Sequence, residues 1–287
     1  MTTSPAESAP VEDPAPACAA GDGAACTRLG TQYARGEGHL ADPYEAMRQY
    51  RRACELGDAR GCMFEAEAYR LGNGVLPDPA KPPELYGRAC ELGAGLGCRS
   101  VGDLVVMGAV VGAAPGSADA WYTRGCDLGD GQSCTARALA VERTHDTDAS
   151  LALFARGCEG GHARACTLLG LRTAMGSDGA KKDADAAIGW FERGCATKPT
   201  DPESCRELGW ARYRGARDDQ AVDAAAGLLD DACYRNDTIA CRYLARVERA
   251  RGRTAEALMA SERACDLGDE PACRLADVLR YRMSSAL

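Results

Sequence analysis

The feature that most constrains the fold is a ten-residue stretch that recurs along the chain. The sequence A-C-E-L-G-D-A-R-G-C occupies residues 53–62, and relatives of its first half stand at 89–93, 125–129 and 264–268. Each copy carries a cysteine, and a later cysteine follows it, usually eight positions on. Successive earlier cysteines are 36, 36, 36, 32, 37, 38 and 32 residues apart. A period in this range is typical of stacked small units rather than one globular core.

The spacing within a copy predicts a tight turn between two helices. If Cys54 and Cys62 lay on one continuous helix, their Cα atoms would be about 12 Å apart. A disulfide spans at most roughly 7 Å between Cα atoms. Gly57 supplies the break, because glycine after a periodic segment is a common helix stop. We therefore expect Cys54 to close one helix and Cys62 to open the next, with a disulfide between them.

All sixteen cysteines fall into eight such pairs. An even number at regular spacing is typical of a disulfide framework. Zinc is the alternative, but its usual closely spaced cysteine knuckles are missing from the sequence. We therefore expect no metal and no cofactor. The predicted disulfides are Cys18–Cys26, Cys54–Cys62, Cys90–Cys98, Cys126–Cys134, Cys158–Cys166, Cys195–Cys205, Cys233–Cys241 and Cys265–Cys273.

The cysteines and the start of the sequence point to different compartments. Stable disulfides favour an extracytoplasmic location, periplasmic or secreted. Residues 1–16, however, show no basic start and no apolar core of a signal peptide, and their prolines and acids predict a disordered leader. The true start lies upstream, export uses another route, or the thiols stay reduced in the cytoplasm. We favour export.

Composition excludes two classes of function. The 287 residues carry a net charge of −8, which argues against a nucleic-acid-binding surface. No apolar run reaches the length of a membrane span.

Helix-sized segments follow one another through the chain, and the sequence contains no signals typical of strands. They lie at 24–36, 43–56, 61–71, 83–92, 97–107, 118–128, 132–143, 148–159, 163–175, 183–196, 202–214, 218–234, 238–251, 254–267 and 271–283.

Two helix patterns alternate within the period. One reads Leu29-Gly30 followed by Tyr33 and Gly36, with copies at 169–176 and 208–215. The other places an aromatic residue four positions before the earlier cysteine, as in Tyr50 before Cys54. A glycine allows two helices to approach closely, and the aromatic ring fills the space beside it.

These two patterns, at a period of about 36 residues, resemble Sel-one-like repeats, which are relatives of the tetratricopeptide repeats. Cysteines eight apart resemble the family's cysteine-rich bacterial subgroup. The resemblance covers residues 17–283 and implies an all-α, right-handed αα-solenoid of about seven to eight helix pairs, clipped by disulfides. Residues 284–287 would form a tail. The resemblance further implies a monomeric scaffold that binds a protein or peptide partner, and the alternative is a penicillin-binding or β-lactamase-like activity.

Catalytic motifs give the β-lactamase alternative no support. The sequence has no S-x-x-K, no K-T-G and no phosphate-binding glycine loop. His39, His145 and His162 are isolated, and we expect each to be a loop or turn residue. We name no catalytic residue.

By resemblance to tetratricopeptide units, the binding groove is lined one, five, eight and nine positions after each later cysteine. Early positions, such as Thr27, are mixed in character. The segments 205–215, 237–253 and 270–283 contain eleven arginines and five acids. Arginine with aromatic residues favours an acidic peptide as partner, and the alternative is a solvated charged face. The predicted groove residues are Arg206, Trp210, Tyr213, Arg214, Arg242, Arg246, Arg249, Arg274, Tyr281 and Arg282.

Overall fold

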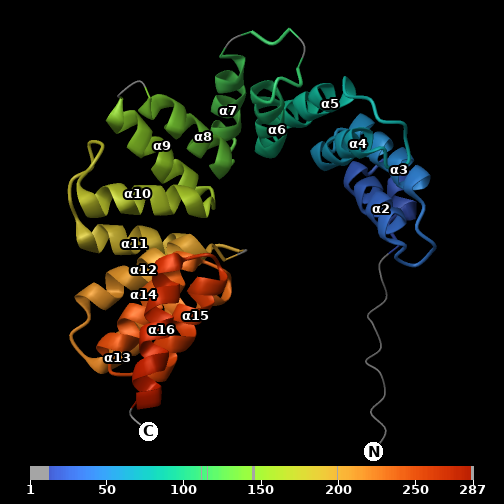
Figure 1. Cartoon of the computed structure of the whole chain (residues 1–287). Coiled ribbons are helices and arrows are strands. Elements are labelled where there is room, and N and C mark those ends of the chain that lie inside the picture. Colours follow the sequence, from blue (N-terminus) through green and yellow to red (C-terminus); the bar gives the residue numbers. More distant parts are fainter. Residues whose placement is uncertain (1–12, 111, 115, 144–145, 199, 286–287) are drawn as a thin grey trace, which may run out of the picture. The chain divides into compact units, whose positions relative to one another are not determined.

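The computed structural model describes residues 13–110, 112–114, 116–143, 146–198 and 200–285. In these ranges it contains sixteen helices and no strand (Figure 1). The all-α prediction is therefore confirmed. The helices are α1 Ala15–Ala19, α2 Gly23–Arg35, α3 Pro43–Glu55, α4 Ala59–Leu71, α5 Lys81–Glu91, α6 Gly95–Val106, α7 Ser117–Asp127, α8 Gly131–Glu142, α9 Thr147–Glu159, α10 Ala163–Met175, α11 Ala184–Cys195, α12 Pro202–Gly215, α13 Asp219–Tyr234, α14 Thr238–Ala250, α15 Thr254–Asp266 and α16 Glu270–Ser285.

The chain divides into two compact units, residues 1–133 (unit 1) and residues 134–287 (unit 2). From α1 to α7 and from α9 to α16, helices that are consecutive in the sequence pack against one another. Helices that carry a later cysteine also contact the next helix of their kind, as α2 contacts α4 and α12 contacts α14. The helices that end at an earlier cysteine do the same, as α13 contacts α15. Each unit is thus a stacked array of helix pairs.

Helix ends follow the local sequence at most positions. Asp42 and Asp201 cap α3 and α12, each accepting backbone N–H groups of the first turn, as expected where a proline follows. Gly36, Gly72 and Gly176 end helices with positive φ angles of 71°, 76° and 71°. Helix α12 extends one residue beyond the predicted segment 202–214, because Gly215 is its last residue and Ala216 is the cap.

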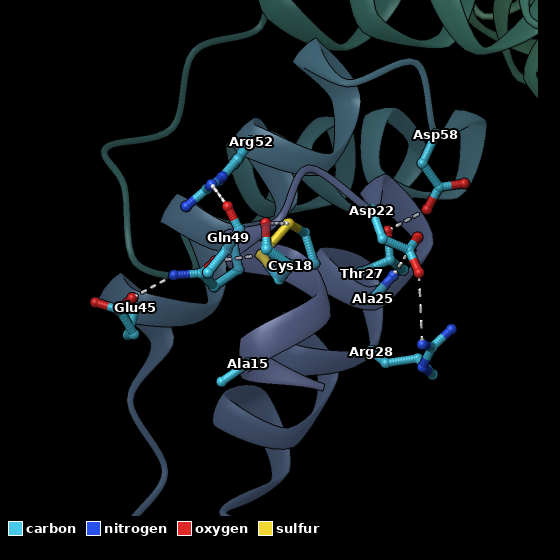
Figure 2. The surroundings of a disulfide bond; sticks show 12 residues. Ala15, Cys18, Asp22, Ala25, Thr27, Arg28, Glu45, Gln49, Arg52 and Asp58 are labelled. Atoms are coloured by element: carbon cyan, nitrogen blue, oxygen red, sulfur yellow. Dashed lines mark hydrogen bonds and ion pairs between the residues drawn. A yellow bond between two sulfur atoms is a disulfide. The ribbon is translucent and has the colours of Figure 1, made fainter. Parts of the chain in front are cut away.

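Seven of the predicted disulfides are present, with Cα atoms 4.4–4.7 Å apart. The two remaining cysteines, Cys126 and Cys134, are also disulfide-bonded. Figure 2 shows the Cys18 bridge beside Asp22, the residue that caps α2 and accepts from the backbone N–H of Ala25. The turn between the two cysteines is therefore held by the disulfide and by the helix cap.

The glycine of the Leu-Gly pattern packs directly on the aromatic ring of the following helix. A Cβ atom added to Gly30 would lie 2.6 Å from the ring of Tyr50, and one added to Gly170 would lie 2.5 Å from the ring of Phe191. Tyr50 and Phe191 are both buried. Close helix approach through glycine, predicted from the pattern, is what the structure contains.

The ends of the described chain differ slightly from the predicted boundaries. Helix α1 begins at Ala15, inside the segment predicted to be a leader, and prolines occupy its first turn. Helix α16 continues to Ser285, inside the predicted tail. The rest of the leader, residues 1–12, and His145 lie outside the described residues.

Candidate binding surface

One of the predicted groove positions is the residue directly after each later cysteine. In six repeats a polar side chain at this position reaches the first turn of the next later-cysteine helix or the residue that caps it. Arg206 Nη1 donates to Asp237 Oδ2 at 2.7 Å, and Asp237 is the cap of α14. Thr27 Oγ1 donates to Asp58, the cap of α4 (Figure 2). We call these pairs inter-repeat ties.

Inter-repeat ties recur in both units with different chemistry. Charged ties join Arg206 to Asp237, Arg99 to Asp130 at 3.3 Å and Arg242 to Asp269 at 3.3 Å. Ties from threonine hydroxyl groups join Thr27 to the Asp58 carboxylate, Thr135 to the cap residue His162 at 2.7 Å and Thr167 to Ser204 at 2.5 Å. Where the cap residue is Ala94, the preceding partner is Met63, and both pack against one apolar cluster. A polar residue after the later cysteine therefore meets a polar residue at the start of the next later-cysteine helix, whereas Met63 and Ala94 are both apolar.

Arg206 is unavailable to a partner for this reason. Its side chain is only 9% exposed and pairs with Glu203, Glu207 and Asp237. Burial alone would lower the pKa of Arg206, but the charges of Asp237 and Glu207 raise it above its usual value. Arg242 keeps an exposed side chain, yet its guanidinium faces Asp269. Sequence position alone does not separate an arginine that binds a cap from one that faces solvent.

Three aromatic side chains and one arginine come together between α12 and α14. The Trp210 ring stacks on Tyr243 with centroids 4.4 Å apart, and on Tyr213 at 5.5 Å. The guanidinium of Arg246 lies over the Trp210 ring, 5.2 Å from its centroid. We call these four residues the aromatic–arginine cluster. The three rings are partly buried, so one side packs on the core and the other remains accessible.

Tyr243 was missed by the sequence prediction. The tetratricopeptide rule selects positions on one helix at a time, and Tyr243 stands two positions after Cys241, outside the rule. It joins the cluster because α14 packs beside α12 and brings it against Trp210. The sequence did contain a signal for Tyr243, because two neighbouring repeats each carry an aromatic residue on the later-cysteine helix. The tetratricopeptide rule does not compare residues between repeats.

The other predicted groove residues divide by their pairing. Arg214, Arg249 and Arg282 are exposed and have no ion pair within the described ranges. Arg246 also has no ion pair there, and its guanidinium lies over the Trp210 ring. Arg274 pairs with Glu270 at 3.8 Å, and Tyr281 is 74% exposed on α16. Arg246 and Arg249 are the unpaired arginines carried by α14 itself.

Two of the corresponding positions in unit 1 carry acids instead. Glu67 and Asp103 stand five residues after their later cysteines, as Trp210 and Arg246 do in unit 2. Glu67 accepts a hydrogen bond from the Tyr86 hydroxyl at 2.6 Å, and Asp103 accepts one from Tyr122 at 2.8 Å. Burial and these carboxylates raise the pKa of both tyrosines. These acids serve the packing of their own repeats.

The described histidines occupy turn positions, as predicted. His39 stacks on Tyr33 with centroids 4.1 Å apart, and His162 caps α10.

Among the residues with described positions, no group of three His, Cys, Asp or Glu side chains could hold a metal ion. None of the described helices is long and apolar enough to cross a membrane.

Comparisons with known proteins identify the repeat. The Sel1 repeat matches residues 23–58, 61–93 and 163–196. The fold is similar to that of c5321, a protective antigen of uropathogenic Escherichia coli strains displaying an SLR fold, with a TM-score of 0.70 and 20% identity over 94% of this chain. The chain spans 59% of that protein. A comparison with curated protein sequences gives no match.

A second solved structure agrees. A Sel1 repeat protein from Oxalobacter formigenes superposes with a TM-score of 0.63 and 24% identity, over 75% of this chain and 89% of the other. At these identities the likeness shows the fold. Three sequence matches and two structural neighbours of the same repeat class agree with the helix-pair period and the glycine–aromatic packing. The chain therefore contains Sel1 repeats and has the all-helical repeat fold of Sel1 repeat proteins.

Proposed function

We propose that this protein is an interaction scaffold that binds an acidic peptide segment of a protein partner at the aromatic–arginine cluster of unit 2. The observation that supports this proposal is the stacking of Trp210 on Tyr243, with the Arg246 guanidinium over the indole ring. Arg249 extends the cluster along α14, three residues from Arg246 and without an acid to neutralise it. The protein acts as a monomer in this proposal.

The chemistry of the cluster fits such a ligand. The planar guanidinium presents a fork of donors that matches a carboxylate, and tryptophan, tyrosine and arginine dominate protein-binding sites. Like charges at neighbouring positions of a helix face repel by a few tenths of a kcal/mol per pair. A bound carboxylate would remove the repulsion between Arg246 and Arg249.

The disulfides support a location of the protein outside the reducing cytoplasm. Disulfides persist in oxidising compartments and are rare in reducing ones. Every described cysteine is disulfide-bonded. We therefore propose that the scaffold operates in the periplasm or the medium.

Fluorescence anisotropy with labelled short peptides tests the proposal. One peptide alternates Glu with Phe and Pro, and its control carries Lys in place of Glu. The oxidised full chain should bind the Glu peptide and not the Lys peptide, and affinity should fall as salt rises from about 0.05 M to about 0.5 M, because screening weakens exposed charge pairs. Equal affinity for both peptides would contradict an acidic ligand. Turnover of nitrocefin by the same sample would favour the β-lactamase-like alternative.

A further inference from the structure

Unit 2 has a concave site on the face of α14 opposite to the aromatic–arginine cluster. The side chains of Leu244, Glu248 and Arg251 face this site, whereas Arg242, Arg246 and Arg249 stand two positions earlier, about 200° around the helix. The cavity has a volume of about 720 Å³, within the range of sites for small ligands. We call it the α13–α15 trough. One wall of the trough is α13, from Asp223 to Cys233, and the other wall is α15, from Glu256 to Asp266.

The trough is acidic at both ends. Six carboxylates and three arginines line it. Asp223 is held by Arg251 and Arg253, and Glu262 pairs with Arg280 at 2.6 Å. Three carboxylates have no ion pair or hydrogen bond within the described ranges. These are Glu256 near the start of α15 and Asp230 and Asp266 toward the other end.

The middle of the trough is apolar and open. Ala226, Leu244 and Ala260 are buried and form the floor, and Met259 stands on the rim with 69% exposure. Gly227 keeps the middle open, because a Cβ added there would meet no atom within 4 Å. The equivalent position, six residues before the earlier cysteine, carries Arg48 in α3 and Glu84 in α5. The middle of the trough is therefore open because residue 227 is a glycine and has no side chain.

A buried carboxylate, Glu248, forms part of the lining of the trough. Glu248 lines the trough with a side chain that is 7% exposed. Its Oε1 accepts from Arg251 at 3.0 Å. Its Oε2 is buried and accepts no hydrogen bond within the described residues, and Arg253 Nε lies 3.9 Å from it. Arg251 and Arg253 therefore hold the Glu248 carboxylate in place beneath the trough.

We propose that the α13–α15 trough binds a linear aliphatic polyamine. Terminal ammonium groups would meet the unpaired carboxylates, Glu256 at one end and Asp230 and Asp266 at the other. The methylene groups would lie on Ala226, Gly227 and Ala260, and an internal ammonium, such as the one in spermidine, would face the open side of the trough. Residues 256 and 266 are ten apart on one helix, so about 15 Å separates the two ends. Two cationic ends joined by an apolar chain match this pattern, whereas a compact metal ion matches only one end.

Isothermal titration calorimetry of the oxidised full chain tests the site with spermidine. We expect saturable binding to a single site. An uncharged diol of similar length, 1,8-octanediol, should not bind, because it lacks the ammonium groups. Magnesium chloride at the same ionic strength should not displace spermidine. Displacement by magnesium, or equal binding of the diol, would overturn the proposal.

Two glycine variants separate the site from general charge attraction. Gly227→Leu fills the middle of the trough and should weaken spermidine binding by at least about tenfold without lowering the melting temperature. Gly189→Leu is the matched control, because Gly189 occupies the equivalent position of α11 and also has no atom within 4 Å of an added Cβ. It should bind spermidine as the unmodified chain does. Unchanged binding by Gly227→Leu would overturn the proposal. Gly227→Leu should leave peptide binding at the aromatic–arginine cluster unchanged. The experiment therefore distinguishes a failure of the polyamine proposal from a failure of the proposed function.

Discussion

Arg206 donates a hydrogen bond from Nη1 to Oδ2 of Asp237 at 2.7 Å, and both side chains are only 9% exposed. Asp237 also accepts the backbone N–H of Ala240 and so caps α14. One carboxylate thus ends one helix and binds the preceding repeat. Because α14 carries Tyr243 and Arg246, this tie holds the cluster residues of α14 beside Trp210.

Asp237→Ala should lower the free energy of unfolding by about 2–4 kcal/mol, because it removes a cap and leaves a buried arginine with fewer partners. Asp218→Ala is the matched control. Asp218 caps α13 through Ala221 but forms no inter-repeat tie within the described ranges, and its loss should cost about 1 kcal/mol. Urea denaturation measures both, and equal costs would show that the tie adds nothing. Adding Arg206→Met to Asp237→Ala imitates Met63 with Ala94 and should recover part of the loss.

Gly170→Ala should destabilise the fold by about 1–3 kcal/mol, because its Cβ would be forced to within 2.5 Å of the buried Phe191 ring. Gly189→Ala is a helical substitution into open space and should stabilise by up to about 1 kcal/mol. Thermal melts of the two variants check the signs. A stabilising Gly170→Ala would mean that the helices can separate at no cost.

Glu65 and Glu67 should respond to pH with opposite signs. Burial raises the pKa of Glu65 above its usual 4.5, against a hydrogen bond from Arg51. Burial would also raise the pKa of Glu67, but hydrogen bonds from Arg70 and Tyr86 outweigh it and lower that pKa. Folded Glu65 thus holds its proton more tightly than the unfolded chain does, so its contribution to stability grows as pH falls toward 4.5. The contribution of Glu67 is present above 4.5 and is lost as pH falls through its lowered pKa.

Denaturation of Glu65→Gln and Glu67→Gln over a range of pH separates these effects. Relative to the unmodified chain, Glu65→Gln should lose stability between neutral pH and about pH 4.5, where protonation relieves only the natural carboxylate. Glu67→Gln should gain relative stability below about pH 4.5, where the natural residue loses its advantage. Parallel pH curves for both variants would contradict the assigned environments.

Reduction should lower the melting temperature of the array. In the chain-entropy model, a bridge that closes a loop of this size contributes about 2.5 kcal/mol, and neighbouring repeats share the loss through their interfaces. Mass spectrometry of a non-reduced digest should first show each bridge within its own repeat, Cys195–Cys205 included. An unchanged melting temperature after verified reduction would show that the bridges do not stabilise the fold.

The helices and disulfides could be predicted because their causes are local. Gly57 ends the segment before Cys62, and Asp42 caps a helix that begins with proline, whatever the rest of the chain does. The glycine–aromatic contact of Gly30 with Tyr50 was also predictable, because it joins neighbouring helices of one repeat. Each of these features depends on a few consecutive residues or on the period.

The binding surface was harder to predict because it depends on partners in other repeats. Arg206 and Arg246 look alike in sequence, yet one pairs with Asp237 and the other lies over Trp210. Tyr243 enters the cluster only because α14 packs beside α12. The open middle of the α13–α15 trough similarly required the neighbouring side chains around Gly227.

The central claim is that Arg246 and Arg249 bind an acidic ligand beside Trp210. Anisotropy of the Glu peptide with the double variant Arg246→Glu and Arg249→Glu tests it most directly. The matched control reverses Arg164 and Arg217, which are exposed in unit 2, have no ion pair within the described ranges and lie outside the cluster. We predict that the cluster variant loses binding by at least about tenfold at an unchanged melting temperature, while the control, with the same net charge, loses much less. Equal losses in the two variants, or full binding by the cluster variant, would contradict the claim.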